Sequence, residues 1–141
     1  MIDEFFREGL LKKEAPSKEK ALKSIEKAQE YLEFARKNLE MELFEATITL
    51  AYSAMFHAAR AIAFSDGVVE RSHFALIQYL IEKHGKSISQ GMLNKLDFYR
   101  KIRHSLSYGL DSKASDEEAE NAVEFAEEFL QEMEEYLEAK K

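Results

Sequence analysis

The sequence has no cysteine, no tryptophan, one proline and five glycines. Without cysteine it can form neither a disulfide framework nor a thiolate metal site. With few helix-breaking residues, and with Ala, Leu, Glu and Lys abundant, we expect an all-α fold. No apolar run approaches the roughly 20 residues needed to span a bilayer.

The first residues lack a basic segment followed by an apolar one, so we expect no signal peptide and a cytoplasmic protein that does not bind a membrane. A chain of 141 residues can bury one sizeable core. We therefore expect one domain over residues 1–141.

The net charge of −7 is unevenly distributed. Residues 1–66 carry 12 acidic and 10 basic side chains, residues 67–113 carry four and eight, and residues 114–141 carry 11 and two. Three of the four histidines lie in the basic middle block. The overall acidity argues against a general double-stranded DNA binder. The overall acidity does not exclude a local anion site in the middle block.

Apolar periodicity predicts an up-and-down antiparallel bundle of four long helices plus shorter ones. The long helices are expected over residues 17–39, 43–64 and 92–108, and from a capping box at Ser115 onward. Short connections predict that sequential helices are antiparallel neighbours.

The shorter elements are expected around the long helices. Residues 2–12 are expected to form a short helix across the bundle, and residues 68–71 a loop. Ser72 is a plausible N-cap for a further helix that stops at Gly85. For His73, in its first turn, we expect the role of a neutral or exposed capping-region residue.

The helix over residues 43–64 is apolar nearly all round, which predicts that it is the most buried one. Its polar residues form one narrow stripe: Thr49, Ser53, His57 and Arg60. Buried polar groups need partners, so the stripe faces another polar stripe, a subunit partner or a ligand groove. Alternatively, the two hydroxyls bond back to the helix backbone while the histidine and arginine reach solvent.

The last turns of the helix over residues 92–108 gather polar residues: Arg100, Arg103, His104 and Tyr108. In an otherwise acidic chain, this cationic patch is the natural place for a phosphate-bearing ligand. Basic side chains near a helix C-terminus also stabilise the helix through its dipole. Both interpretations stay open at this stage.

We expect no metal and no cofactor. The sequence has no Gly-rich phosphate loop and no His-Glu-x-x-His motif. A di-iron bundle would need a glutamate three residues before an inward-facing histidine. None precedes His57 in that position, and Lys101 stands there for His104.

Five segments, taken together in their order and spacing, are typical of one protein family: Phe6–Lys13, Ala28–Lys37, Ala51–Ile62, Gly67 followed by Ser72-His73, and the ending from Arg103 to Gly109. Through these segments the chain resembles, over nearly all its length, HEPN-domain proteins of the small stand-alone prokaryotic type. The resemblance implies a helical bundle that commonly forms homodimers. Such proteins are often encoded with a minimal nucleotidyltransferase as toxin and antitoxin.

Many proteins of that family are metal-independent RNases, in which an arginine on the fourth helix is followed after four to six residues by a histidine. Here no histidine follows Arg103 at that spacing, and only three residues separate Arg100 from His104. Tyr108 occupies the place of the RNase histidine. Tyrosine is a poor general base near neutral pH, since its reference pKa is ~10.

The first functional hypothesis is a binding module. A homodimer would bind a nucleotide, an RNA or a nucleotidyltransferase partner in a cleft between the fourth helices. Arg100 and Arg103 would hold phosphate there. Tyr108 would stack on a base or accept a nucleotide from the partner, and His57 and Arg60 would line the adjoining wall.

The second hypothesis is an RNase with a variant Arg/His motif. His104 would be the general base, and Arg103 or Arg100 would stabilise the charge on the scissile phosphate. In either case an apolar dimer interface is expected near Tyr52, Phe98 and Tyr99.

Overall fold

The structure, a computed structural model, describes residues 1–140, which form six helices and one two-stranded sheet. The helices are α1 (Ile2–Arg7), α2 (Lys18–Glu40), α3 (Phe44–Asp66), α4 (His73–His84), α5 (Gln90–Tyr108) and α6 (Asp116–Ala139). The strands are β1 (Leu11–Lys13) and β2 (Val68–Glu70). The predicted all-α class is confirmed, because each strand is only three residues long.

Serine side chains set the start of three helices. Ser17, Ser72 and Ser115 each accept a hydrogen bond from the backbone N–H three residues on, at 3.0 to 3.1 Å. At α6 the carboxylate of Glu118 also accepts from the Ser115 N–H, at 3.0 Å. These bonds satisfy N–H groups that the first helical turn leaves unpaired. The predicted caps at Ser72 and Ser115 are thus confirmed.

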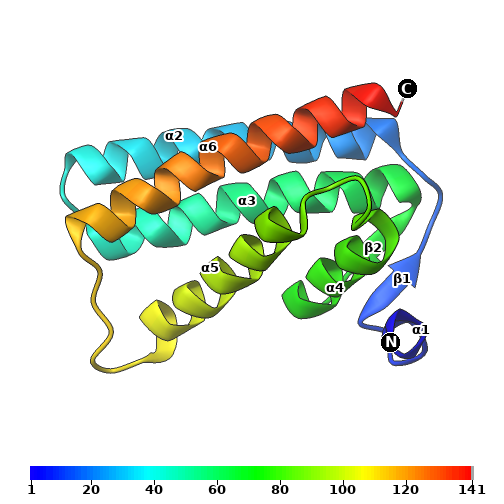
Figure 1. Cartoon of the computed structure of the whole chain (residues 1–141), viewed down its shortest axis with the longest axis horizontal. Helices are drawn as coiled ribbons and strands as arrows, with labels where there is room; N and C mark the ends of the chain where they lie inside the picture. The colour runs from blue at the N-terminus through cyan, green and yellow to red at the C-terminus, as the bar shows by residue number, and fades with distance from the viewer. Residues whose placement is uncertain (141) are drawn as a thin grey trace.

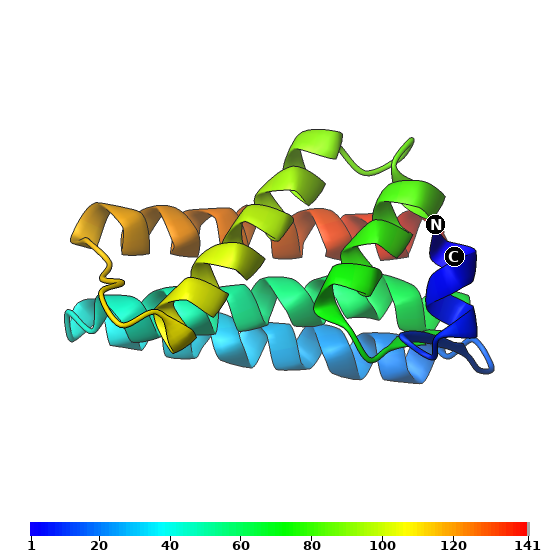
Figure 2. The same cartoon turned by 90° about the horizontal axis from the view of Figure 1, so that it is seen from below.

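The three longest helices lie side by side, and α2 runs antiparallel to both α3 and α6 (Figure 1). On its other side α3 packs against α4 and α5 (Figure 2). The core therefore surrounds α3, in which Met55, Ala58 and Ile62 have no exposed surface. The prediction that this helix is the most buried one is confirmed.

One neighbour relationship differs from expectation. Helix α5 crosses the bundle obliquely instead of running along α6 (Figure 2), and it meets α6 where Tyr99 stacks on Phe125 at 5.7 Å. Helix α6 packs instead against α3 and α2. Ala119, Ala122 and Ala126 are fully buried, and their size lets α6 approach α3 and α2 closely.

The expected loop over residues 68–71 is wrong in part, since Val68–Glu70 pairs antiparallel with Leu11–Lys13. The segment 2–12 is correspondingly a helix followed by a strand. Gly67 makes this possible: its φ is +82°, and a Cβ there would lie 2.4 Å from the carbonyl oxygen of Glu14. The sheet ties the N-terminal segment to the end of α3.

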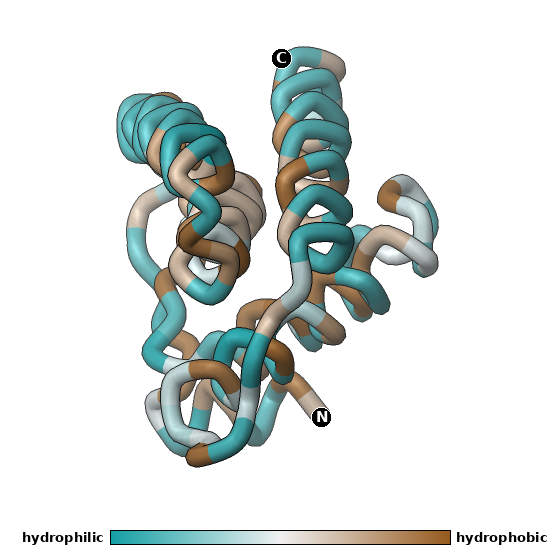
Figure 3. The backbone as a smooth tube through the Cα atoms, turned by 90° about the vertical axis from the view of Figure 1, so that its left-hand side faces the viewer, coloured by the Kyte–Doolittle hydropathy of each residue, from teal (hydrophilic) through white to brown (hydrophobic). Residues whose placement is uncertain are grey.

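Hydrophilic residues cover much of the outer surface. In Figure 3 the helix that ends at the C label, α6, is hydrophilic along most of its length, with hydrophobic residues interspersed. Its buried side chains recur at helical spacing and include Phe129 and Met133. Among the described residues no helix is both long enough and apolar enough to cross a bilayer.

Candidate functional site

The site is built where the first turn of α4 meets the middle of α3. The Tyr52 hydroxyl lies 2.9 Å from Nδ1 of His73, and the two ring centroids are 5.8 Å apart. Burial raises the pKa of the Tyr52 hydroxyl, although Arg100 and Arg103 act in the opposite direction. Tyr52 therefore stays protonated and can donate to His73.

His73 is a neutral ring on an aromatic surface. Its imidazole stacks on Phe56, with 3.8 Å between centroids and 14° between planes. Burial is the main cause that lowers the pKa of His73 to about 4. Three guanidinium groups lower it further: those of Arg103, Arg60 and Arg100. We call these three residues the arginine cluster.

Arg60 is the member that α3 contributes. Its Nη2 lies 2.9 Å from Oε1 of Glu70, and its guanidinium carbon lies 5.0 Å from the Phe64 ring centroid. Burial raises the pKa of Glu70, while Arg60 lowers it. Within residues 1–140 the Arg60 Nε and the Glu70 Oε2 are buried without hydrogen-bond partners. The charge of Arg60 is thus already paired with that of Glu70 within the chain.

Arg100, from α5, is also paired. Its Nε donates to Oδ1 of Asp97 at 2.7 Å, and its guanidinium carbon lies 5.3 Å from the Phe74 ring centroid. Lys101 approaches the other oxygen of Asp97 at 3.4 Å. The side chains of this pair are only 25% and 21% exposed, so separating them would leave a largely buried carboxylate without its cation. A phosphate can instead contact the other N–H groups of the Arg100 guanidinium while Nε keeps its bond to Asp97.

Arg103 differs from the other two arginines. It is half-buried on α5 and, in the part of the chain that the structure describes, its guanidinium has no hydrogen bond and no ion pair. Its charge acts to lower the pKa of both His73 and Tyr52. The N–H donors of this guanidinium have no acceptor among the described residues and are available to a ligand. An anion from outside the chain would give the Arg103 guanidinium the partner that the described residues do not supply.

His57 lies on the far side of Arg60, where it stacks on Tyr31 with 5.3 Å between centroids and 5° between planes. Burial lowers the pKa of His57 to about 4, and Arg60 and Lys27 add to the effect. Its backbone carbonyl accepts a hydrogen bond from the buried Ser24 hydroxyl at 2.6 Å. His57 therefore presents a neutral aromatic ring, not a cation.

His104 and Tyr108 form a ring contact of their own at the exposed end of α5. Their ring centroids are 4.7 Å apart, His104 is exposed, and Tyr108 is 71% exposed at the end of α5. Among the described residues the His104 ring stacks on neither His73 nor His57. The predicted patch therefore divides into two parts.

The polar stripe on α3 divides in the same way. The Ser53 hydroxyl bonds back to the carbonyl of Thr49 at 3.2 Å, as the backbone alternative predicts. Arg60 instead pairs with Glu70 of β2, and His57 stacks on Tyr31 of α2.

Sequence reasoning missed His73, Phe56 and Glu70 as parts of the site. His73 is neutral, as expected, but half-buried and not exposed. The one signal in the sequence was its place directly after the Ser72 cap, which fixes where the first turn of α4 begins. Nothing local indicates that α3 lies beneath it.

The interface expectation needs correction for two residues. Tyr52 is 1% exposed and Tyr99 is 8% exposed within the single chain, so neither can supply interface area. Phe98 is 54% exposed and Phe74 is 40% exposed. Phe98 and Phe74 are therefore the phenylalanines of α5 and α4 left for an apolar interface, and of the two Phe74 lies against Arg100.

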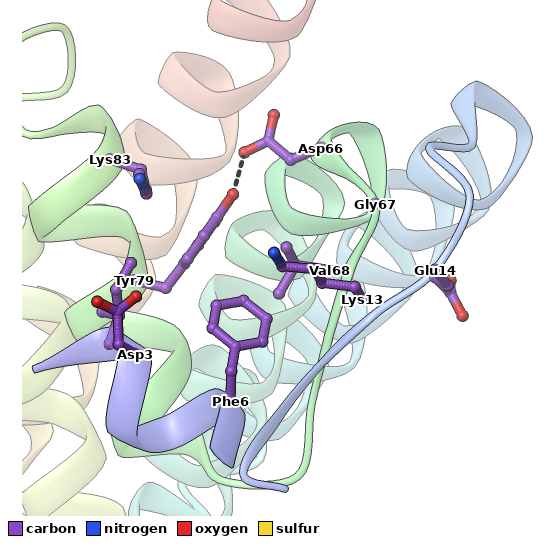
Figure 4. Close-up of a pocket in the computed structure, with 10 residues that line it drawn as sticks. Asp3, Phe6, Lys13, Glu14, Asp66, Gly67, Val68, Tyr79 and Lys83 are labelled. Carbon is purple, nitrogen blue, oxygen red and sulfur yellow. Dashed lines mark hydrogen bonds between the residues drawn. The ribbon is translucent and has the colours of Figure 1, made fainter.

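Away from the arginine cluster, a hollow of about 300 Å³ lies where α1 and the sheet meet α4 and the end of α3 (Figure 4). Its lining mixes charges, with Lys13 and Lys83 opposed by Asp3 and Asp66. The Tyr79 hydroxyl points to Asp66 and donates to it at 2.8 Å.

The carboxylate of Asp66 is fully engaged within the chain. His84 Nε2 lies 2.6 Å from Oδ2, and Lys140 Nζ lies 2.9 Å from Oδ1. Burial acts to raise the pKa of Asp66, but bonds from His84, Lys140 and Tyr79 hold it well below its usual range. Nδ1 of His84 in turn lies 2.6 Å from the Tyr136 hydroxyl. This network fastens α3, α4 and α6 together and leaves little for a ligand.

Across the described residues no group of three or more His, Asp or Glu side chains is placed to hold a metal ion. The arginine cluster instead offers guanidinium donors, a neutral imidazole and aromatic faces. Such a set binds phosphate and bases rather than cations.

The comparisons with known proteins agree with this fold. The HEPN domain family matches residues 21–136. A UPF0332 protein of Archaeoglobus fulgidus is 32% identical over 108 residues, which cover 76% of this chain and 86% of that protein. Both matches span most of the bundle, and the chain therefore belongs to the HEPN domain family.

Proposed function

We propose that this protein binds RNA or a nucleotide at the arginine cluster, with phosphate held by Arg103 and Arg100. The observation that carries the proposal is Arg103, a half-buried residue whose guanidinium has no anionic partner among residues 1–140. Arginine forks bind phosphate with charge-assisted bonds, which are stronger than neutral ones. A phosphate at this point would also accept from His73.

We further propose that the protein acts as a homodimer, with the cleft between the two copies of α5. Phe98 and Phe74 are large and exposed, and the Phe74 ring lies 5.3 Å from the guanidinium carbon of Arg100. Aromatic residues with arginine at their side are typical of interface cores. Two such clusters facing one cleft would double the positive charge available to an RNA.

A minimal nucleotidyltransferase is the protein partner that we propose, in a toxin–antitoxin type of system. The Tyr108 hydroxyl is open to solvent at the end of α5. It can attack the α-phosphate of a nucleoside triphosphate held by that enzyme, forming a tyrosyl phosphodiester and releasing pyrophosphate. The added phosphate would then lie on the same helix as Arg103.

The geometry favours binding over cleavage as the function of the cluster. An RNase needs a base beside the scissile phosphate, and His104 makes its ring contact with Tyr108, not with the arginine cluster. His73 lies in the cluster, but a pKa of about 4 makes it a weak base. The metal-independent RNase with His104 as base remains the second candidate.

One experiment separates the two candidates. Wild-type protein is incubated with a labelled single-stranded RNA in EDTA, and binding and cleavage are measured in parallel. We expect salt-dependent binding and no cleavage. Cleavage that falls by about two to four orders of magnitude in His104→Ala, with binding retained, would establish the RNase instead. Absence of any RNA or nucleotide binding would overturn both.

A further inference from the structure

An open groove between α2 and α3, with a volume of about 500 Å³, adjoins the arginine cluster at Arg60. Four of its lining side chains are cationic and one is a carboxylate: Lys20, Lys23, Lys27, Arg60 and Glu14. We call it the lysine groove. It is separate from the patch on α5, and its lysines belong to no motif that the sequence singled out.

Contacts between α2 and α3 fix the base of the lysine groove. The hydroxyl of Ser24, which is 5% exposed, donates to the carbonyl of His57 at 2.6 Å and so joins the two helices. Beside it the rings of Tyr31 and His57 stack face to face. Because His57 stays neutral near pH 7, this wall is aromatic and uncharged.

The lysine groove and the arginine cluster share one residue, Arg60, which lines the groove and also lowers the pKa of His73. His57 lines the groove as well. The ring of Phe56 lies between them, 6.0 Å from the His57 centroid and 3.8 Å from that of His73. Cations and aromatic faces therefore continue from α5 across α3 to α2.

The lysines of the groove are available to a ligand. Lys20 pairs with Glu14 at 2.8 Å, and Lys23 and Lys27 pair with acidic residues of their own helix at 3.1 and 3.3 Å. All three lysines are more than half exposed in these pairs. Exposed ion pairs contribute little to stability, so the ammonium groups can turn to phosphate at small cost.

The spacing of the lysines indicates a polymer. From Lys20 to Lys27 the rise of α2 is about 10 Å, at ~1.5 Å per residue. Three ammonium groups spread over that length are placed to contact successive phosphates of one strand, while bases use the aromatic wall, as in single-strand binding surfaces.

We propose that the lysine groove is a second phosphate-binding subsite, and that the ligand of the arginine cluster is a single-stranded RNA long enough to reach it. This inference rests on the proposed function, because the strand is anchored at Arg103. A mononucleotide would occupy the arginine cluster alone.

The test compares two ligands and three variants by fluorescence anisotropy. The ligands are a labelled 12-nucleotide single-stranded RNA and labelled AMP. The variants are Arg103→Ala, the groove triple variant Lys20→Gln with Lys23→Gln and Lys27→Gln, and a matched triple variant with the same charge change. The matched variant carries Lys37→Gln, Lys83→Gln and Lys86→Gln, all at exposed positions outside both sites.

For the groove triple variant we expect RNA affinity to fall about tenfold or more and AMP affinity to stay unchanged. The salt dependence of RNA binding should also become shallower by about 2, because each phosphate that a lysine neutralises on a single strand adds ~0.7 to the slope. Arg103→Ala should weaken both ligands, and the matched triple variant should change RNA affinity less than threefold.

The outcomes are distinguishable. If the groove variant and the matched variant bind RNA equally, with equal salt dependence, the second subsite is overturned while the proposed function stands. If Arg103→Ala changes neither ligand but the groove variant loses RNA, the subsite stands and the anchor at Arg103 is wrong. Wild-type protein that binds neither ligand overturns both.

Discussion

The hydroxyl of Tyr52 lies 2.9 Å from Nδ1 of His73, so a residue of the most buried helix fixes the first residue of α4. Both rings are removed from water to a large degree. With Tyr52 as the donor, the neutral imidazole carries its proton on Nε2. His73 can then offer that proton to an anion held by the neighbouring arginines.

Removing this hydroxyl should be measurable without unfolding the protein. Tyr52→Phe leaves the Nδ1 of His73 without a partner in a half-buried place. We expect the free energy of unfolding to fall by about 1 kcal/mol, the usual contribution of a neutral hydrogen bond. Urea denaturation measures it, with Tyr108→Phe as the control, because the Tyr108 side chain is 71% exposed. Equal losses in both variants would contradict the assignment.

Stability should depend on pH through two histidines. The pKa values of His57 and His73 are about 4 in the folded chain against 6.5 in the unfolded chain. Between these values the unfolded state binds more protons, so the free energy of unfolding falls as the pH decreases from 6.5 to about 4. Above pH 7 this contribution is constant.

Urea titrations at pH 7.0, 5.5 and 4.5 measure the effect, and the control is the double variant His57→Gln with His73→Gln. Glu70 acts in the opposite direction, because burial raises its pKa. The informative quantity is therefore the difference between the wild type and the double variant. If both lose stability equally over this range, the two histidines are not buried as described.

Much of the fold could be predicted, because its signals are local. The caps at Ser72 and Ser115 come from the chemistry of one helical turn. The strand Val68–Glu70 could not be predicted, because three residues carry no measurable alternation and the partner strand lies more than 50 residues away.

The site could be predicted only in part. The cationic residues of α5 were visible as a basic block. The pairing of Arg100 with Asp97 is local, because the two residues lie three apart on α5. The absence of a partner for Arg103 among the described residues depends on how α5 crosses α3 and α4. The placement of His73 against Phe56 depends on the same packing. No pattern along the sequence indicates this packing.

The Asp66 network should be a strong structural contact. Asp66→Asn removes the charge that accepts from Tyr79, Lys140 and His84. Bonds to a charged group contribute more than neutral ones, so we expect a loss of about 2–3 kcal/mol in the free energy of unfolding. The control is Asp111→Asn, at an exposed position before α6. An effect within about 0.5 kcal/mol of that control would show that the network contributes little.

The proposed homodimer can be tested by mass in solution. Light scattering of the wild type at micromolar concentration should give about twice the 16.3 kDa of one chain. Phe98→Asp should return the mass to that of one chain, because an unpaired charge in an interface core is costly. Phe34→Asp is the matched control, since Phe34 is 46% exposed on α2. A wild-type mass near that of one chain at all concentrations would exclude a stable dimer.

The central claim is that Arg103 holds a phosphate. The most direct measurement is the affinity of Arg103→Ala for a single-stranded RNA at fixed salt, beside the control Arg71→Ala at an exposed position outside α5. Loss of a charge-assisted contact costs about 1.5–3 kcal/mol, so we expect Arg103→Ala to bind roughly 10- to 100-fold more weakly. Arg71→Ala should bind within about threefold of the wild type. Equal affinity of Arg103→Ala and the wild type would contradict the claim.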